Sequence, residues 1–289
     1  MTKNHAHHRT PRWLLALLLA ALATIGPFAV DTYMPAFGGM SQDLNATTLE
    51  MQQTLSVYLA AFAFMFLFHG ALSDSYGRKP VILVGLSIFA IASVGCALSQ
   101  TVGQLIFFRA LQGASVGAGM VVGRAMIRDL FDDTEAQKLM SMVTMWFGLG
   151  PAIAPILGGI LYTQFGWHSI FWFIAAISGL LFVTSIFAFQ ETLPIEKRQS
   201  FRVSPLLSGY REVGASIPFL LLSFAIGCNF NGYFLYMLSA PVFLPEVLHL
   251  GPTEYAWLFV PGIAGIIFGA YISGRVAGRW SPASSCSVA

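Results

Sequence analysis

Residues 51–99 read MQQTLSVYLAAFAFMFLFHGALSDSYGRKPVILVGLSIFAIASVGCALS, in which two long apolar blocks flank one short polar turn. Each block reaches the roughly 20 residues that an α-helix needs to cross the hydrocarbon core of a membrane. The apolar positions are continuous rather than three or four residues apart, so the blocks lack the single apolar stripe of a soluble bundle helix. This stretch therefore predicts two membrane-spanning helices joined by a tight turn.

The rest of the chain repeats this pattern. Of 289 residues, 56% are hydrophobic and 10% are charged, whereas a soluble domain carries about 25% charged residues. Only helices and closed barrels satisfy the backbone in lipid, and the strand-like alternation of a barrel is missing from the sequence. We predict an all-α polytopic membrane protein with spans at 13–37, 51–72, 80–99, 103–127, 139–163, 168–190, 216–240 and 253–278.

The polar segment 191–215 is the only long interruption between spans. It predicts a boundary between a six-helix half, residues 1–190, and a partial second half, residues 216–289, that holds two spans and a polar tail. No ninth hydrophobic run follows in the sequence. The expected architecture is thus one complete six-helix half, an inter-half loop on the cytoplasmic side, and two further helices.

The positive charges predict the orientation. With the N-terminus in the cytoplasm, 14 of the 15 lysines and arginines fall on the cytoplasmic side or at helix ends facing it, as the positive-inside rule requires. The exception is Arg109, within the fourth span. The first span is too long for the apolar core of a signal peptide, and no convincing cleavage site follows it.

Several kinds of function find no support in the sequence. A net charge of +2 gives no reason to expect a nucleic-acid partner, and no catalytic triad, phosphate loop or metal cluster is recognisable. We therefore expect no enzyme, no cofactor and no metal site. The three cysteines, Cys96, Cys228 and Cys286, have neither pairing nor metal-ligand spacing and are expected to be free thiols.

The turn between the second and third spans reads GALSDSYGRKP over residues 70–80. Glycines permit the reversal of the backbone, and a proline suits the first turn of the next helix. The string resembles the G-x-L-x-D-x-x-G-R-K signature of the major facilitator superfamily, in which this hairpin latches against a late helix of the second half. The resemblance assigns conformational roles to Gly70, Asp74, Gly77, Arg78 and Lys79.

Two more strings resemble elements of that superfamily. Arg109-x-x-Gln112-Gly113 is similar to its R-x-x-Q-G element, with Ser115 where glycine is usual. Residues 150–159, GPAIAPILGG, resemble the antiporter motif of its exporters, with alanine at one glycine position; the motif residues are Gly150, Pro151, Pro155, Gly158 and Gly159. The small residues at every fourth position also predict a close helix crossing, so a purely structural role is at least as well supported as gating.

The first span holds the string that points to a subfamily. Asp31-x-Tyr33-x-Pro35 resembles the bicyclomycin/chloramphenicol-resistance (Bcr/CflA) drug:proton antiporters. The resemblance implies a bacterial inner (plasma) membrane protein driven by the proton gradient without a bound cofactor. Its partners would be protons, membrane lipid and a small amphipathic or hydrophobic substrate. A complete protein of this kind is expected to be a monomer, and this chain would be one truncated after the eighth helix.

Asp31 is the strongest candidate for proton coupling. A charge near the middle of a membrane helix costs about 2.5–3.5 kcal/mol, so it normally faces a cavity or a partner. Asp31 and Arg109 each lie about six residues from the outer end of their helices, which places them at similar depth at ~1.5 Å per residue. We hypothesise that they share a wet cavity in which water access changes the protonation of Asp31. The alternative is a static pair that only holds two helices together.

The remaining candidates are polar or aromatic residues on predicted spans. Those expected to line a substrate cavity are Tyr33, Tyr58, Gln112, Asn229, Asn231 and Tyr233. For the two asparagines, hydrogen bonding between helices is an equal alternative. Asp129, just after the fourth span, either pairs with Arg78 or is a solvated loop charge.

The function predicted from these residues is proton-coupled efflux of multiple drugs or other small molecules. Export of a natural metabolite such as an amino acid or a sugar is an alternative that the sequence does not discriminate. An alternative of a different functional class is that the chain is a truncated membrane fragment that transports nothing.

Overall fold

The computed structural model describes residues 11–246, 264–265, 268–269, 271–272 and 275, and it has no strand among them. The predicted all-α class is therefore confirmed for the described part of the chain. The helices are α1 (Arg12–Asp31), η1 (Met34–Ala36), α2 (Phe37–Asp43), α3 (Thr48–Tyr76), α4 (Arg78–Ala97), α5 (Val102–Leu130), α6 (Asp133–Phe165), α7 (His168–Ala188), η2 (Ile195–Lys197), α8 (Val203–Gly214) and α9 (Ile217–Glu246).

Within the described part of the chain, five segments are long and apolar enough to cross a membrane. They are Trp13–Asp43, Thr48–Tyr76, Arg78–Ala97, Val102–Leu130 and His168–Ala188. A sixth is present if Val203–Gly214 and Ile217–Cys228, which meet at 83°, count as one bent span. The fifth predicted span lies within α6, whose apolar stretch Ile153–Phe165 is shorter. The chain is thus a multi-pass membrane protein, and its predicted eighth span lies largely outside the described residues.

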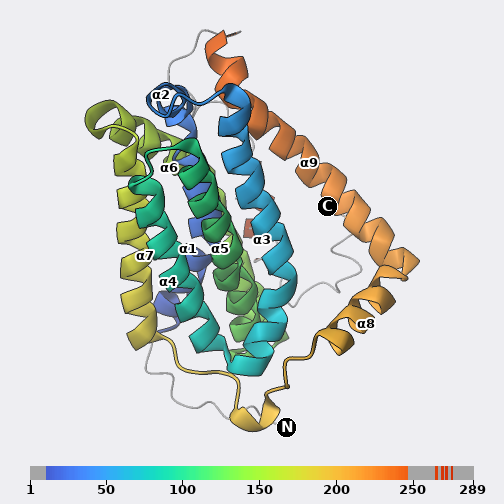
Figure 1. The fold of residues 1–289 in the computed structure, drawn as a ribbon. Helices are drawn as coiled ribbons and strands as arrows, with labels where there is room; N and C mark the ends of the chain where they lie inside the picture. The colour runs from blue at the N-terminus through green and yellow to red at the C-terminus, as the bar shows by residue number, and fades with distance from the viewer. Residues whose placement is uncertain (1–10, 247–263, 266–267, 270, 273–274, 276–289) are drawn as a thin grey trace.

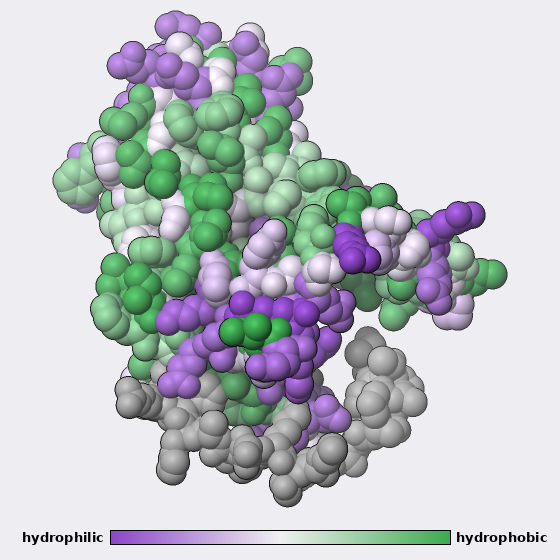
Figure 2. All heavy atoms as spheres, turned by 60° about the horizontal axis from the view of Figure 1, so that its bottom comes forward, coloured by the Kyte–Doolittle hydropathy of each residue, from purple (hydrophilic) through white to green (hydrophobic). Residues whose placement is uncertain are grey.

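Helices α1 and α3–α7 form one elongated bundle (Figure 1). The turn between α3 and α4 is at one end of it, which we call the hairpin end, and α2 is at the other, the α2 end. Hydrophilic residues gather over the hairpin end, whereas hydrophobic residues cover the flanks (Figure 2). This distribution matches a body whose sides meet lipid and whose ends meet water.

The first predicted span is broken near its α2 end. Helix α1 stops at Asp31, and the chain continues through a turn into η1 and α2. Pro35 has no N–H with which to bond the carbonyl of Asp31 four residues earlier, so the α-helical ladder cannot continue through this point. Asp31 is therefore the last residue of its helix rather than a residue in the middle of one.

Helix α6 crosses α1 at very short range because glycines face it. A Cβ on Gly150 would lie 2.7 Å from Cγ2 of Thr24, and one on Gly158 would lie 1.8 Å from the carbonyl oxygen of Thr32. These contacts recur at the same spacing of eight residues on both helices, and the intervening Ala154 is fully buried. The small-residue stripe predicted from the sequence is thus the surface on which α1 rests.

The segment 191–215, predicted as a loop, contains the amphipathic helix α8. Its apolar residues recur at helical spacing, at Val203, Leu206, Leu207, Tyr210 and Val213. Beyond it, α9 begins apart from the bundle and runs obliquely toward the level of the α2 end (Figure 1), and its described side chains are exposed on every side.

Candidate functional site

Arg109 lies fully buried in the core of the bundle, between two aromatic rings. Its Cζ is 4.4 Å from the ring centroid of Tyr33 and 4.2 Å from that of Tyr58. Hydrogen bonds fix the position of each ring. The Tyr33 hydroxyl lies 3.2 Å from Thr54 Oγ1, and the Tyr58 hydroxyl donates to the carbonyl of Gly26 at 3.0 Å. A desolvated cation over an aromatic face is stabilised by about 2 kcal/mol or more. The two tyrosines therefore partly compensate for the hydration that Arg109 loses on burial.

The edge of the guanidinium that carries Nη1 is bonded to two helices. Nη1 donates to the carbonyl of Ala29 at 3.4 Å and to Oε1 of Gln112 at 3.0 Å. The Gln112 amide is oriented by α4, since its Nε2 donates to Ser93 Oγ at 2.8 Å. Gln112 was predicted to line a substrate cavity; in the structure it positions Arg109.

The other edge of the same guanidinium is open. Among the described residues, neither Nε nor Nη2 of Arg109 has a hydrogen-bond partner, although both atoms are buried. These two N–H groups form the flat fork that a carboxylate can accept side-on through both oxygens. An unsatisfied buried donor costs about 1–3 kcal/mol, so this edge is a place where an acceptor would bind favourably.

Asp31 supplies an acceptor in the same region of the bundle. Asp31 is 2% exposed, and its Oδ2 has no hydrogen-bond partner in the described part of the chain. Ala29 and Tyr33, both two residues from Asp31 in the chain, each contact Arg109. Within the described residues, however, no nitrogen of Arg109 lies within 4.0 Å of the Asp31 carboxylate. The Asp31 carboxylate and the Arg109 fork thus lie at a similar depth in the bundle but form no ion pair with each other.

A second polar cluster lies at the hairpin end, around Arg78. Its Nη1 donates to Asp74 Oδ1 at 2.5 Å and to Ser73 Oγ at 2.6 Å, and its Nε donates to Asp129 Oδ2 at 3.1 Å. The pairing of Arg78 with Asp129 is therefore present, which joins α4 to the end of α5. Lys79 turns toward α7, where its Nζ donates to the carbonyl of Ile186 at 2.6 Å.

Glu191 completes this cluster, and the sequence interpretation missed it. Its Oε1 accepts from the Arg78 amide at 2.9 Å and its Oε2 from the Lys79 amide at 3.3 Å. Gly77, before α4, has no side chain to cap that helix, so the carboxylate from the segment after α7 takes this role. Gly77 has a φ of +101°, and a Cβ there would lie 2.4 Å from Glu191 Oε2. The only signal was a lone carboxylate directly after the sixth span.

Other predicted residues fall elsewhere. Asn231 lies on α9 and is exposed; it lines a hollow of ≈760 Å³ together with other residues of that helix. The side chains of Asn229, Tyr233 and Pro151 lie outside the described residues. Gly70 approaches Val121 of α5 in ordinary contact, and Pro155 and Gly159 are buried in α6. The structure therefore gathers Tyr33, Tyr58, Gln112 and Arg109 and does not bring Asn231 to them.

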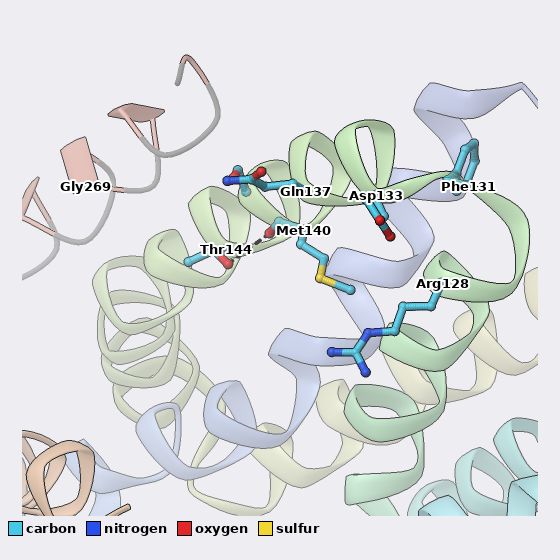
Figure 3. Close-up of a pocket in the computed structure, with 9 residues that line it drawn as sticks. Arg128, Phe131, Asp133, Gln137, Met140, Thr144 and Gly269 are labelled. Carbon is cyan, nitrogen blue, oxygen red and sulfur yellow. Dashed lines mark hydrogen bonds between the residues drawn. The ribbon is translucent and has the colours of Figure 1, made fainter. Parts of the chain in front are cut away.

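Another cavity lies near the hairpin end, apart from the buried arginine. It measures ≈600 Å³ and is lined by Arg128, Phe131, Asp133, Ala136, Gln137, Met140, Ser141, Thr144 and Gly269. In Figure 3 the side chains of α5 and α6 face it from one side, and Gly269 lies across from Gln137 and Thr144. Its polar and apolar lining would suit an amphipathic molecule, but sequence reasoning selected none of these residues.

Known proteins resemble the chain over almost its whole length. An uncharacterised MFS-type transporter of Bacillus subtilis (strain 168) is 33% identical over 92% of this chain and 67% of its own length. The bicyclomycin resistance protein homolog of Haemophilus influenzae is 30% identical over 91% of this chain and 66% of its own. Multidrug resistance protein D of Escherichia coli (strain K12) is 30% identical over 92% of this chain and 67% of its own length. The chain thus spans about two thirds of the length of these relatives.

A solved structure shares the fold. The crystal structure of the human organic anion transporter MFSD10 (TETRAN) aligns with a TM-score of 0.62 and 18% identity, over 95% of this chain and 74% of that one. The sequence model of the Major Facilitator Superfamily matches residues 9–289. These relatives indicate a transporter rather than an enzyme, and the chain belongs to the Major Facilitator Superfamily.

Proposed function

We propose that this chain acts in proton-coupled export of small amphipathic molecules across a bacterial inner membrane, with its N-terminus in the cytoplasm. The observations that carry the proposal are the buried carboxylate of Asp31 and, on a neighbouring helix, an arginine fork that lacks an acceptor among the described residues. Relatives named for bicyclomycin and multidrug resistance support a drug-like cargo rather than a natural metabolite.

The geometry supports a two-position cycle for Asp31. When ionised, the carboxylate docks on Nε and Nη2 of Arg109, because this fork offers two charge-assisted hydrogen bonds. When protonated, it loses most of that attraction and leaves the fork free for an acceptor group of the cargo. Asp31 is the last residue of α1, so its movement would involve the end of the helix and the neighbouring contact of Thr32 with Gly158. A proton that enters down a potential of 100 mV supplies about 2.3 kcal/mol per charge.

The experiment replaces the carboxylate in the full chain. Asp31→Asn keeps the size and polarity of the side chain but cannot ionise, so efflux of ethidium driven by a pH gradient is expected to fall to background in a strain without its own drug exporters. Glu196→Gln, which removes an exposed carboxylate near the hairpin end, is the matched control and should leave efflux unchanged. Normal efflux by Asp31→Asn, at equal protein abundance, contradicts the proposal.

A further inference from the structure

His69 is a buried titratable side chain that the proposed cycle does not use. It lies on α3 and is 4% exposed; the ring interacts with the backbone of Met65 one turn earlier, and its Nδ1 makes no well-formed hydrogen bond among the described residues. A buried polar atom without a partner costs stability. Ionisable residues inside membrane helices are rare and usually face a functional pathway. A buried imidazole at this position is therefore a candidate for a functional role.

A glycine of α5 makes the room for this ring. A Cβ on Gly117 would lie 3.1 Å from Nδ1 and 3.3 Å from Cε1 of His69, and 3.5 Å from Cε2 of Phe62. Any larger residue at position 117 would press on the imidazole. The unpartnered nitrogen thus faces the backbone of α5, the helix that also carries Arg109, across an otherwise apolar crossing.

His69 lies between the two polar clusters of the bundle. Along α3 it is eleven residues from Tyr58, about 16 Å, and five residues from Asp74, about 8 Å. Gly117, which contacts the ring, is eight residues beyond Arg109 on α5, about 12 Å. The imidazole is therefore a polar group partway from the buried arginine to the hairpin end.

The neighbouring helices bring few other charges to this level. Those closest to it along the chain of each helix are Asp74 on α3, Arg78 on α4, Arg109 and Arg124 on α5, and Arg211 and Glu212 on α8, whereas α1 has no charged residue between Arg12 and Asp31. On α8, the Tyr210 hydroxyl donates to the carbonyl of Leu67, two residues before His69. No described carboxylate pairs with the ring, so its charge can change without breaking an ion pair.

We propose that His69 is the residue that carries protons from the Asp31 level to the hairpin end. A proton released by the Asp31 carboxyl passes through water to Nδ1 of His69, and the resulting imidazolium then loses a proton to water at the hairpin end. The ring returns to its neutral form in each cycle, and no other group is consumed. Imidazole suits this task because it gains and loses a proton near neutral pH. The inference rests on the proposed proton coupling.

The test uses the full chain in proteoliposomes with a trapped pH dye and ethidium as the transported probe. His69→Gln and His69→Asn keep a polar side chain but do not titrate, so the rate of proton-coupled flux should fall by about tenfold or more. The dependence of the remaining rate on pH should flatten between about pH 5 and 8, and KM for ethidium should stay constant. His168→Gln, which alters an exposed histidine near the α2 end, is the matched control and should retain the original profile.

The outcomes separate the relay from the proposed function. If the unmodified chain couples flux to protons and both His69 variants keep its rate and pH profile, the relay is wrong and the export proposal stands. If the unmodified chain moves no protons, the export proposal fails and the relay fails with it. A lower rate with an unshifted pH profile in both variants would assign His69 a packing role only and would also overturn the relay.

Discussion

At the scale of single residues, the decisive feature is an arginine that is bonded on one edge and unbonded on the other. Tyr33 and Tyr58 hold the plane of the Arg109 guanidinium, and Gln112 and Ala29 occupy one nitrogen. A hydrogen-bond acceptor would therefore bind to the planar fork of Nε and Nη2, and not only to the positive charge. Lysine carries the same charge but offers neither the fork nor the stacking surface.

Arg109→Lys is therefore expected to abolish proton-coupled efflux and to lower the free energy of unfolding by about 2 kcal/mol, because the stacking contacts are lost. Denaturant titration in detergent and the efflux assay would measure the two effects. Arg124→Lys, at an exposed position on the same helix, should change stability by less than about 0.5 kcal/mol. Retained efflux in Arg109→Lys would show that charge alone is sufficient.

At the scale of helices, the contact of α6 with α1 depends on two glycines. The closest approach joins Gly158 to the carbonyl of Thr32, the residue that follows Asp31. This crossing therefore supports the segment in which α1 ends. The glycines of the antiporter-like motif thus have a direct structural use, which does not depend on any gating role.

Gly158→Ala should force the two helices apart, because its Cβ would lie 1.8 Å from a backbone oxygen. We expect a loss of about 3 kcal/mol in the free energy of unfolding together with reduced efflux. Gly179→Ala on α7 meets open space and should be neutral or stabilising by up to about 1 kcal/mol. Equal melting temperatures for the two variants would contradict the crossing.

The sequence predicted most helices because long apolar blocks show where a chain can cross lipid. It did not predict α8, whose apolar stripe is short and lies in a segment that reads as polar. Nor could it predict which polar residues meet. The placement of Gln112 against Ser93, and of Glu191 against the α4 amides, depends on contacts 19 and 113 residues apart in the chain.

At the scale of the whole molecule, hydrophilic residues gather over the hairpin end and hydrophobic residues cover the flanks (Figure 2), and α9 begins apart from the bundle (Figure 1). Most of the described side chains of α9, and outer positions of α3 such as Phe64 and Leu67, are exposed and apolar. Lipid accepts such surfaces at no hydrophobic cost, so these faces are compatible with a membrane setting.

The proposed orientation predicts which end is reached from each side of the membrane. In a chain with Cys228 and Cys286 changed to serine, Gln42→Cys on α2 should react with a membrane-impermeant maleimide in intact cells, because its end would face outward. Glu196→Cys should react only in inverted vesicles. The buried Cys96 can remain in both variants. The opposite labelling pattern would place the N-terminus outside.

The carboxylate that caps α4 has a consequence for biogenesis. Glu191 is synthesised 113 residues after Arg78, and at 5–20 residues per second this corresponds to a delay on the order of ten seconds. During this interval α4 is already made, but its first amides lack their eventual acceptor. The connection between α3 and α4 therefore gains its final hydrogen bonds only after α7 has been synthesised.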